Sequence, residues 1–476
     1  MTHPLFDSLI ETVGLPKPAQ DTVSVIGTDP VVDTPFKVGE TAAAVLAAQG
    51  YAVSRIGQMR GGSAQEISVE AKAAALATAS VFFQSQHGYP IMVPEPDYPT
   101  VGLYPTLDGR HILVHGGYPK LRDGILDILR CADKTSSVAN AIAKWNAFEL
   151  EETIADKGLC GAVMRSPKEW LAHPQGQAIA DTPPVEIIKL ADSDPVPFTP
   201  ADRPLDGVRV LDLTHVIAGP TCAKSLAEQG ASVMHVTCPF QPNLPPFVMD
   251  TGHGKLSALL DLKQPTDKVK LRELLKTTDV FSQSYRPGKL TSLGFSPEGL
   301  AEMRPGIIVV STSCYGHTGP WHFRPGFEQL AQTVTGMAAV QGSMDSPQLA
   351  PTFPNDYITG FLSSLGVLAA LYRRATEGGS YHVRVSLSRT AMFLMEQGLV
   401  DRSALPPTPI THEERAAYMR EEDSALGRLS YLGPVIKYSK TPGRFDLQPF
   451  PLGAHEPVWP AGTPSLRAPT DVPKAA

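Results

Sequence analysis

The chain has 476 residues, with 41 Lys and Arg against 48 Asp and Glu, a formal charge of −7, and no run of like charges. This balance argues against a surface for nucleic acids or other polyanions. No basic start precedes an apolar segment, and no window reaches the ~18 uncharged apolar residues of a membrane span, so we expect a cytoplasmic protein without membrane contact. The five cysteines are scattered, which predicts reduced thiols and no metal site.

Before residue 204 the pattern predicts two parts. Residues 1–95 contain an apolar helical stretch at 43–63, and residues 96–195 combine the strand-like GRHILVHG with several helical stretches, including one continuous helix over SPKEWLAHPQGQAIA. We interpret 96–195 as a smaller α+β domain. The proline-rich stretch 181–204 then reads as a linker.

From residue 204 onward strands alternate with helices. VRVLDL, the loop THVIAGP, a helix from Thr221 to about Gln229 and SVMHVT form a β-α-β unit, and the alternation continues through DVFSQ and GIIVVSTS. Alternation of this kind predicts an α/β domain over 204–400, built on an open parallel Rossmann-like sheet. Residues 401–476 remain as a closing segment with a proline-rich tail.

The sequence also contains an internal repeat. AAVLAAQGYAVSRIGQMRGGS at 43–63 aligns without a gap with GFLSSLGVLAALYRRATEGGS at 360–380, and a strand-like stretch follows each copy. A shared apolar pattern can arise by coincidence, but the Gly-Gly-Ser at the same offset favours duplication. In this alignment Gly39 occupies the place of Asp356.

Six blocks in order resemble class III CoA-transferases, the group that includes formyl-CoA transferase, carnitine CoA-transferase and α-methylacyl-CoA racemase. They are the segment 204–236, GKLSALLDLK, DVFSQSYRPGKLTSLGF, IIVVSTSCYGHTGP, RPGFEQLAQTVTGMA and NDYITGFLSSLGVLAALYRR. Residues 103–180 resemble the small domain of the family, which ordinarily follows the Rossmann part but here precedes it. A duplicated ancestor that lost parts of each copy explains this order, with 1–95 as the degenerate copy.

The resemblance implies that Asp356 is the catalytic nucleophile. A carboxylate held in line and partly stripped of water attacks a thioester to give an anhydride, and the released thiolate then forms an aspartyl-CoA thioester. The acceptor acid takes the CoA from this thioester without hydrolysis. Judged by position alone, Asp356 also fits an ordinary N-cap of the helix that follows it. Coenzyme A enters this scheme as a substrate, and no metal is needed.

The resemblance also implies the residues that bind CoA. The loop THVIAGP joins a strand end to a helix N-terminus, where sheets present amides to ligands. It has no G-x-G-x-x-G, which counts against NAD or FAD. The CoA-binding residues that carry over are His215, Val216, Ala218, Lys255, Tyr285, Arg286 and Tyr315, with Lys255 directed at the 3′-phosphate. Two departures, Thr237 in place of an acidic residue and Ile217 in place of a glutamine, leave the ribose contacts and the loop closure open.

Two other functions remain open. A racemase of this family needs a histidine directly after the glycine of R-P-G-F-E, and this chain has Phe327 there, while His317 and His322 lie at the wrong offset. A non-catalytic CoA-binding or scaffold protein is the second alternative. The partners implied by the resemblance are an acyl-CoA, a carboxylic acid and a second copy of the chain in a homodimer.

Overall fold

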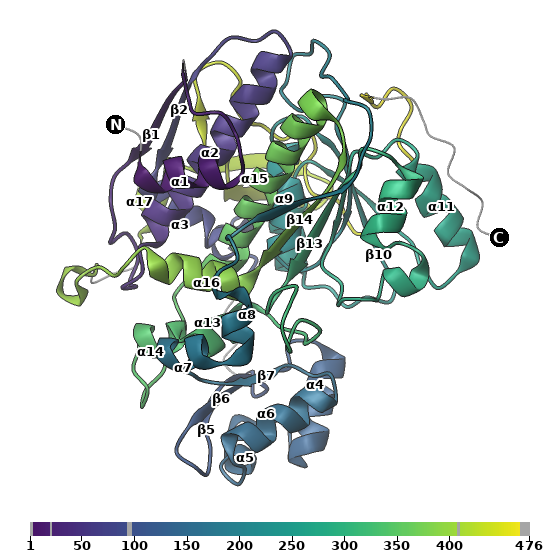
Figure 1. The fold of residues 1–476 in the computed structure, drawn as a ribbon. Helices are drawn as coiled ribbons and strands as arrows, with labels where there is room; N and C mark the ends of the chain where they lie inside the picture. The colour runs from purple at the N-terminus through teal and green to yellow at the C-terminus, as the bar shows by residue number, and fades with distance from the viewer. Residues whose placement is uncertain (1–2, 20, 93–97, 407–409, 467–476) are drawn as a thin grey trace.

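A computed structural model describes residues 3–19, 21–92, 98–406 and 410–466 (Figure 1). Its largest sheet has seven strands in the order β11-β10-β9-β12-β13-β14-β8. The first six are parallel to one another, and β8 pairs antiparallel with β14 at one edge. Their bounds are β8 Glu186–Ala191, β9 Arg209–Leu213, β10 Ser232–Thr237, β11 Lys255–Leu259, β12 Val280–Gln283, β13 Ile308–Ser313 and β14 Ser380–Ser386. The strand order reverses between β9 and β12, as in doubly wound sheets, which present ligand sites at that reversal.

Helices cover both faces of this sheet because side chains along each strand alternate between the faces. On β9, Val210 packs into the core beneath α9 (Ala218–Ala227) and α15 (Pro354–Glu377). Its neighbour Leu211 packs into the opposite core, beneath α11 (Pro265–Leu275) and α12 (Pro297–Met303). The predicted α/β class with an open, mostly parallel sheet is therefore confirmed.

The helix after β9 begins earlier than the sequence pattern indicates. It starts at Ala218 instead of Thr221, with Pro220 in its first turn. Proline is tolerated there because amides of the first turn have no partner within the helix. The predicted loop is therefore reduced to residues 214–217.

A smaller antiparallel sheet, β5-β6-β7, lies at the bottom of Figure 1 beside three helices. Its core is its own and includes Ile112, Ile125 and Leu150. The elements are β5 Val101–Pro105, β6 His111–His115, α4 Pro119–Leu129, α5 Thr135–Ile142, α6 Ala147–Asp156 and β7 Gly161–Val163. This is the smaller α+β part expected within 96–195, although the limits of independent domains stay a prediction.

The helix expected over SPKEWLAHPQGQAIA is two helices, α7 (Pro167–Ala172) and α8 (Pro174–Ala180). His173 between them is extended, with ψ of 138°. The reason is Pro174, whose ring disfavours helical backbone in the preceding residue. The prediction of one continuous helix was wrong.

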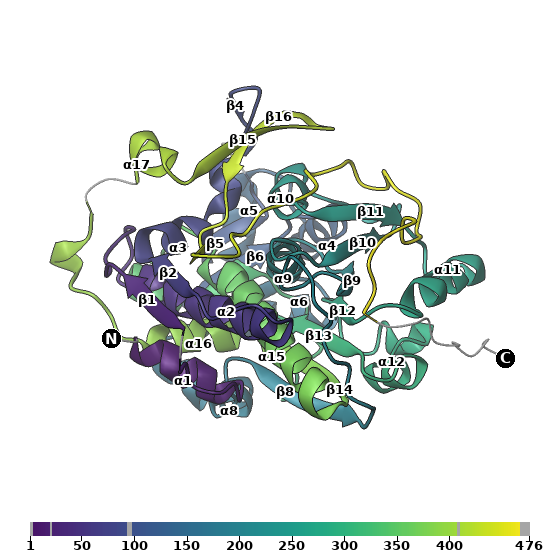
Figure 2. The same ribbon diagram turned by 90° about the horizontal axis from the view of Figure 1, so that it is seen from above.

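The two repeated stretches fold as like units. α2 (Val38–Met59), β2 (Glu66–Glu70) and α3 (Ala71–Ala77) follow one another as do α15, β14 and α16 (Leu387–Glu396). The helices α2 and α15 run side by side (Figure 2) and share one core. β2 lies in a sheet with β1 (Thr22–Ile26) and β17 (Lys437–Tyr438), so both ends of the chain contribute to this unit.

The remaining elements are a first helix, a four-stranded sheet and two short helices before α15. α1 (Pro4–Thr12) packs on α2, and a four-stranded sheet of β15 (Met419–Ser424), β16 (Gly427–Leu432), β3 (Ser85–Gln86) and β4 (Tyr89–Pro90) projects from the body (Figure 2). α13 (Glu328–Thr335) and α14 (Met337–Gln341) precede α15. Within the described residues, no helix has the length and apolar character that crossing a membrane requires.

Candidate active site

Asp356 lies in the first turn of α15, but it does not cap that helix. Phe353 precedes the helix, and its side chain makes no capping hydrogen bond. Instead the carboxylate of Glu328, on α13, accepts hydrogen bonds from the backbone amides of Asn355 (3.3 Å) and Asp356 (2.5 Å). Because Glu328 satisfies these amides, the N-cap interpretation of Asp356 was wrong, and its carboxylate is available for another role.

The surroundings of the Asp356 carboxyl group disfavour its negatively charged form. The residue is 7% exposed, and among the described residues none donates a hydrogen bond to its carboxylate. Burial raises the pKa of Asp356 to about 7. Burial, followed by the negative charge of Asp356, raises the pKa of Glu328 well above its usual range. Two buried carboxyl groups this close resist carrying two negative charges together.

Aromatic side chains from the small sheet pack against Phe327, the residue before Glu328. Phe327 stacks on His115 with ring centres 4.2 Å apart and on Tyr118 at 5.9 Å. Tyr118, at the start of α4, has its pKa raised to about 12 by burial and by the negative charge of Asp356. Tyr118 therefore lies within electrostatic reach of Asp356, and the small sheet contributes to the site.

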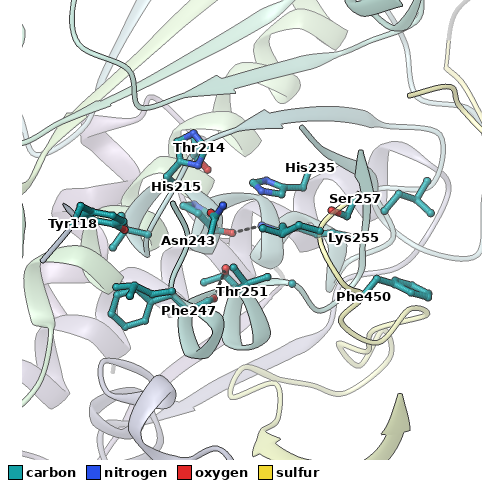
Figure 3. Close-up of a pocket in the computed structure, with 17 residues that line it drawn as sticks. Tyr118, Thr214, His215, His235, Asn243, Phe247, Thr251, Lys255, Ser257 and Phe450 are labelled. Carbon is teal, nitrogen blue, oxygen red and sulfur yellow. Dashed lines mark hydrogen bonds between the residues drawn. The ribbon is translucent and has the colours of Figure 1, made fainter. Parts of the chain in front are cut away.

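Tyr118 also lines a cavity of about 40 Å³ that lies at the carboxyl end of β9, beside His235 of β10 and the first residues of β11. Figure 3 shows Tyr118 at one end and Phe450 at the other, with His215 and His235 on one wall and Phe247 on the opposite wall. Phe450 belongs to the C-terminal segment, which bonds to β11 where the amide of Ser257 donates to His455 Nδ1 (3.1 Å). Stretches that lie far apart in the sequence thus meet at this cavity.

A buried charge network lies beneath the cavity. The ammonium group of Lys255 donates to Asp212 Oδ2 and to the carbonyl of Pro220, both at 2.8 Å. Asp212 also accepts from the Thr214 hydroxyl and lies 3.5 Å from His235 Nδ1. Burial alone would raise the pKa of Asp212, but the charge of Lys255 and the hydrogen bond from His235 hold it below its usual range.

The environment of Lys255 therefore differs from that of the phosphate-binding lysine which the family resemblance implied. Lys255 lines the cavity, yet it is only 3% exposed and Asp212 neutralises its charge. Burial lowers its pKa, and Asp212 opposes that effect. Its contact with a phosphate stays a prediction, whereas its hydrogen bond to the Pro220 carbonyl joins it to the first turn of α9.

The loop before α9 is strained and tightly held. Val216 has φ of +69°, a left-handed conformation that is rare for a β-branched residue and often marks a functional site. The His215 amide donates to Ser284 Oγ at 3.3 Å, and His215 Nε2 lies 3.1 Å from the Tyr285 hydroxyl. Burial and the nearby His235 lower the pKa of His215 to about 4, so its imidazole is neutral at pH 7.

The other predicted residues occupy three places. Ala218 is the first residue of α9, and its carbonyl lies against Gly360 of α15, where an added Cβ would come within 2.7 Å. Arg286 lines a neighbouring cavity and donates to the carbonyl of Gly158 at 2.8 Å. Tyr315 is buried against Trp321, with ring centres 5.4 Å apart, and burial raises its pKa well above the usual range. The structure thus groups His215, Val216 and Lys255 around one cavity and leaves Arg286 and Tyr315 outside it.

The gap-free alignment places Gly39 opposite Asp356, whereas the third residue of α2, which corresponds in its helix to Asp356 in α15, is Glu40. Gly39 donates to Asp29 Oδ1 at 3.2 Å, and the Glu40 amide donates to Asp29 Oδ2 at 2.7 Å. Asp29 thus closes α2 as Glu328 closes α15. A Cβ on Gly39 would lie 2.9 Å from the carbonyl oxygen of Ala71, so a side chain is not accommodated there.

Sequence reasoning missed Glu328, Tyr118, His235 and Asp212. Glu328 follows directly after Phe327, but nothing in its spacing shows that α13 brings it to α15. Asp212 is a polar residue inside an apolar strand, which was a usable signal because a buried carboxylate needs a partner. Among the described residues, no group of three or more His, Cys, Asp or Glu side chains could hold a metal ion.

The fold and the site define an α/β protein with a cavity at the strand ends and a buried carboxyl pair beside it. Comparison with known proteins gives the family. Residues 205–420 match the model of CoA-transferase family III. The family resemblance is confirmed.

Three relatives illustrate the match. An acetyl-coenzyme A transferase, nodX, of Hypoxylon pulicicidum is 34% identical over 60% of this chain and 52% of the relative. An acyl-CoA transferase of Gibberella moniliformis is 30% identical over 67% of this chain and 65% of the relative. A formyl-CoA:oxalate CoA-transferase of Rhodopseudomonas palustris is 35% identical over 44% of this chain and 52% of the relative. The chain spans less than two thirds of the length of each.

Proposed function

We propose that this protein transfers CoA from an acyl-CoA to a free carboxylic acid, with Asp356 as the nucleophile. The observation that carries the proposal is the buried Asp356 carboxyl group, which receives no hydrogen bond from the described residues and lies beside the cavity residue Tyr118. A carboxylate that lacks hydrogen-bonding partners is a stronger nucleophile than a solvated one. The match of residues 205–420 to CoA-transferase family III supports the same reaction.

The reaction balances without an outside reagent. The Asp356 carboxylate attacks the thioester carbonyl, the C–S bond breaks, and an acyl-aspartyl anhydride and CoA thiolate result. The thiolate attacks the aspartyl carbonyl, which releases the first acid and forms an aspartyl-CoA thioester. The acceptor carboxylate attacks this thioester and again frees the thiolate, which takes the acceptor acyl group and restores Asp356. One thioester is consumed and one is formed.

Glu328 would act as a positioning residue in this scheme. It holds the amides of Asn355 and Asp356 and so fixes the first turn of α15. The negative charge of Asp356 disfavours ionised Glu328, and acylation of Asp356 removes that charge. The pair therefore favours the acylated state relative to the free carboxylate.

CoA would lie across the loop that precedes α9. His215, Val216 and Lys255 line the cavity there, and the hydroxyl of Tyr285 is joined to His215. Ala218 presents the first amides of α9, which favour a negatively charged group. Contacts of Arg286 and Tyr315 with CoA, assembly as a homodimer and a cytoplasmic location remain predictions.

The racemase alternative lacks support in the site. Phe327 is stacked between His115 and Tyr118, and a phenyl ring cannot transfer a proton. His317 and His322 line the cavity beside Arg286 instead. Deuterium incorporation at the α-carbon of a bound acyl-CoA would support racemisation, whereas CoA binding without either reaction would support the scaffold alternative.

The decisive experiment traps the covalent intermediate. The protein is incubated with a panel of acyl-CoAs and acids, treated with hydroxylamine, and digested for mass spectrometry. Hydroxylamine should modify Asp356, and Asp356→Asn should abolish both the modification and CoA exchange. Asp29→Asn is the matched control, since Asp29 is a carboxylate at the start of the repeated helix. CoA exchange that persists in Asp356→Asn would refute the proposal.

A further inference from the structure

The start of α15, the helix that carries the proposed nucleophile, is bonded to residues 78–81, which follow α3. The backbone amide of Phe353, directly before α15, donates to the Thr78 carbonyl at 3.0 Å. The backbone amide of Val81 donates to the hydroxyl of Tyr357, the residue after the nucleophile, at 3.2 Å. Residues on both sides of the nucleophile are therefore held by a part of the chain that lies outside the match to CoA-transferase family III.

The Tyr357 hydroxyl in turn donates to a buried carboxylate, that of Asp250 on α10 (Pro245–Thr251), at 2.7 Å. The hydroxyl of Ser80 lies within hydrogen-bond distance of both Asp250 oxygens, at 2.9 and 2.8 Å, and Lys224 of α9 donates to one of them at 3.2 Å. Asp250 is 1% exposed, and a carboxylate this deeply buried requires such donors. Three separate parts of the chain thus bond to one side chain of α10.

The same short helix forms a wall of the cavity proposed to hold CoA. Phe247 and Thr251 of α10 lie on this wall (Figure 3), together with Val248. Phe247 also contacts Phe353, with ring centres 6.4 Å apart. Asp250 itself is not among the residues that line the cavity. It therefore joins the nucleophile's helix to the cavity wall from behind.

The first turn of α15 is consequently held from two directions. Glu328 of α13 binds its backbone amides, while Asp250 and residues 78–81 bind Tyr357 from the other side. Hydrogen bonds are directional, so this arrangement fixes the rotation of the helix as well as its distance from α10. An attacking carboxylate must lie close to the thioester carbon and in line with it, and a displacement of about 1 Å can cost about 100-fold in rate.

We propose that Ser80, Asp250 and Tyr357 are positioning residues for CoA transfer, which hold the nucleophile at a fixed distance and orientation to the CoA cavity. Through Ser80, residues 1–95 take part in the transfer. This inference rests on the proposed function, because it assigns these residues a role in attack by Asp356. Their loss should slow acylation of Asp356 and leave the affinity for CoA unchanged, since the cavity lining stays intact.

Single-turnover acylation of the nucleophile by formyl-, acetyl-, succinyl- and benzoyl-CoA, trapped with hydroxylamine, tests the proposal beside calorimetry with free CoA. Tyr357→Phe and Ser80→Ala each remove one donor from the buried carboxylate. Ser80→Thr keeps the hydroxyl, and the cavity of about 50 Å³ that Ser80 lines has room for the added methyl group. Tyr381→Phe is the matched control. Like Tyr357, Tyr381 is 2% exposed, and its hydroxyl lies 3.0 Å from Glu377 at the opposite end of α15.

Tyr357→Phe and Ser80→Ala should each slow labelling of Asp356 about 10- to 100-fold and bind free CoA within about twofold of the wild type. Ser80→Thr should regain most of the lost rate, and Tyr381→Phe should be labelled at the wild-type rate. The double variant should lose less than the product of the two single losses, because both hydroxyl groups act on Asp250.

Unchanged labelling in Tyr357→Phe and Ser80→Ala, or an equal loss in Tyr381→Phe, would overturn the inference and leave the proposed function intact. A loss of CoA affinity as large as the loss of rate would also overturn it, because these residues would then shape the cavity and not the attack. A wild type without any labelling of Asp356 would refute the proposed function, and the inference with it.

Discussion

The raised pKa of Asp356 makes a prediction about stability that is independent of catalysis. Its folded-state pKa of about 7 compares with an ordinary value of 3.8, and this difference corresponds to about 4 kcal/mol. Because the folded pKa is above the unfolded one, the protein loses stability as the pH rises from about 4 to 7. Above pH 7 the ionised, buried carboxylate destabilises the fold by the full amount.

Asp356→Asn keeps the size of the side chain and removes this titration. The variant should equal the wild type in stability near pH 4, exceed it progressively as the pH rises, and be more stable by up to about 4 kcal/mol at pH 8. Urea denaturation at each pH measures the difference. Asp108→Asn is a control of opposite sign, since a hydrogen bond from the Thr106 hydroxyl lowers the pKa of Asp108. A constant difference between wild type and Asp356→Asn from pH 4 to 8 would refute the reasoning.

Three further predictions follow from the same contacts. CoA exchange should increase with pH through about 7 in a plot of kcat/KM against pH, because Asp356 ionises there; a rate unchanged from pH 5 to 8 would contradict the role of Asp356 as the nucleophile. Gly360→Ala should cost about 1–3 kcal/mol in urea denaturation, because its Cβ would meet α9 at 2.6 Å; unchanged stability would show that the helices have room to separate. Lys255→Met should lower the free energy of unfolding in urea by about 3–5 kcal/mol, because it leaves the buried Asp212 carboxylate without its cation. Unchanged stability together with a loss of CoA affinity would instead favour a contact between Lys255 and a phosphate.

Much of the secondary structure that positions the site could be predicted from local sequence patterns. Alternation of strands and helices after residue 204 predicted the parallel sheet, since each strand and helix must bury an apolar face against the next. The repeated Gly-Gly-Ser predicted two like units, and α2 and α15 with their following strands are such units. The strand-to-helix loop around His215 was found because parallel strands present their carboxyl ends to ligands.

The sequence by itself therefore determined the order of the elements, the loop near the cavity and, through family resemblance, the choice of Asp356. Only the tertiary structure decided the electrostatics of the site. Glu328 reaches α15 from α13, and Tyr118 reaches the cavity from the small sheet. Lys255 of β11 is buried against Asp212 of β9, two strands away in the same sheet, rather than exposed to solvent. The physical reason is that a charge takes its pKa and its partner from groups that folding brings near it, and these groups are distant in sequence.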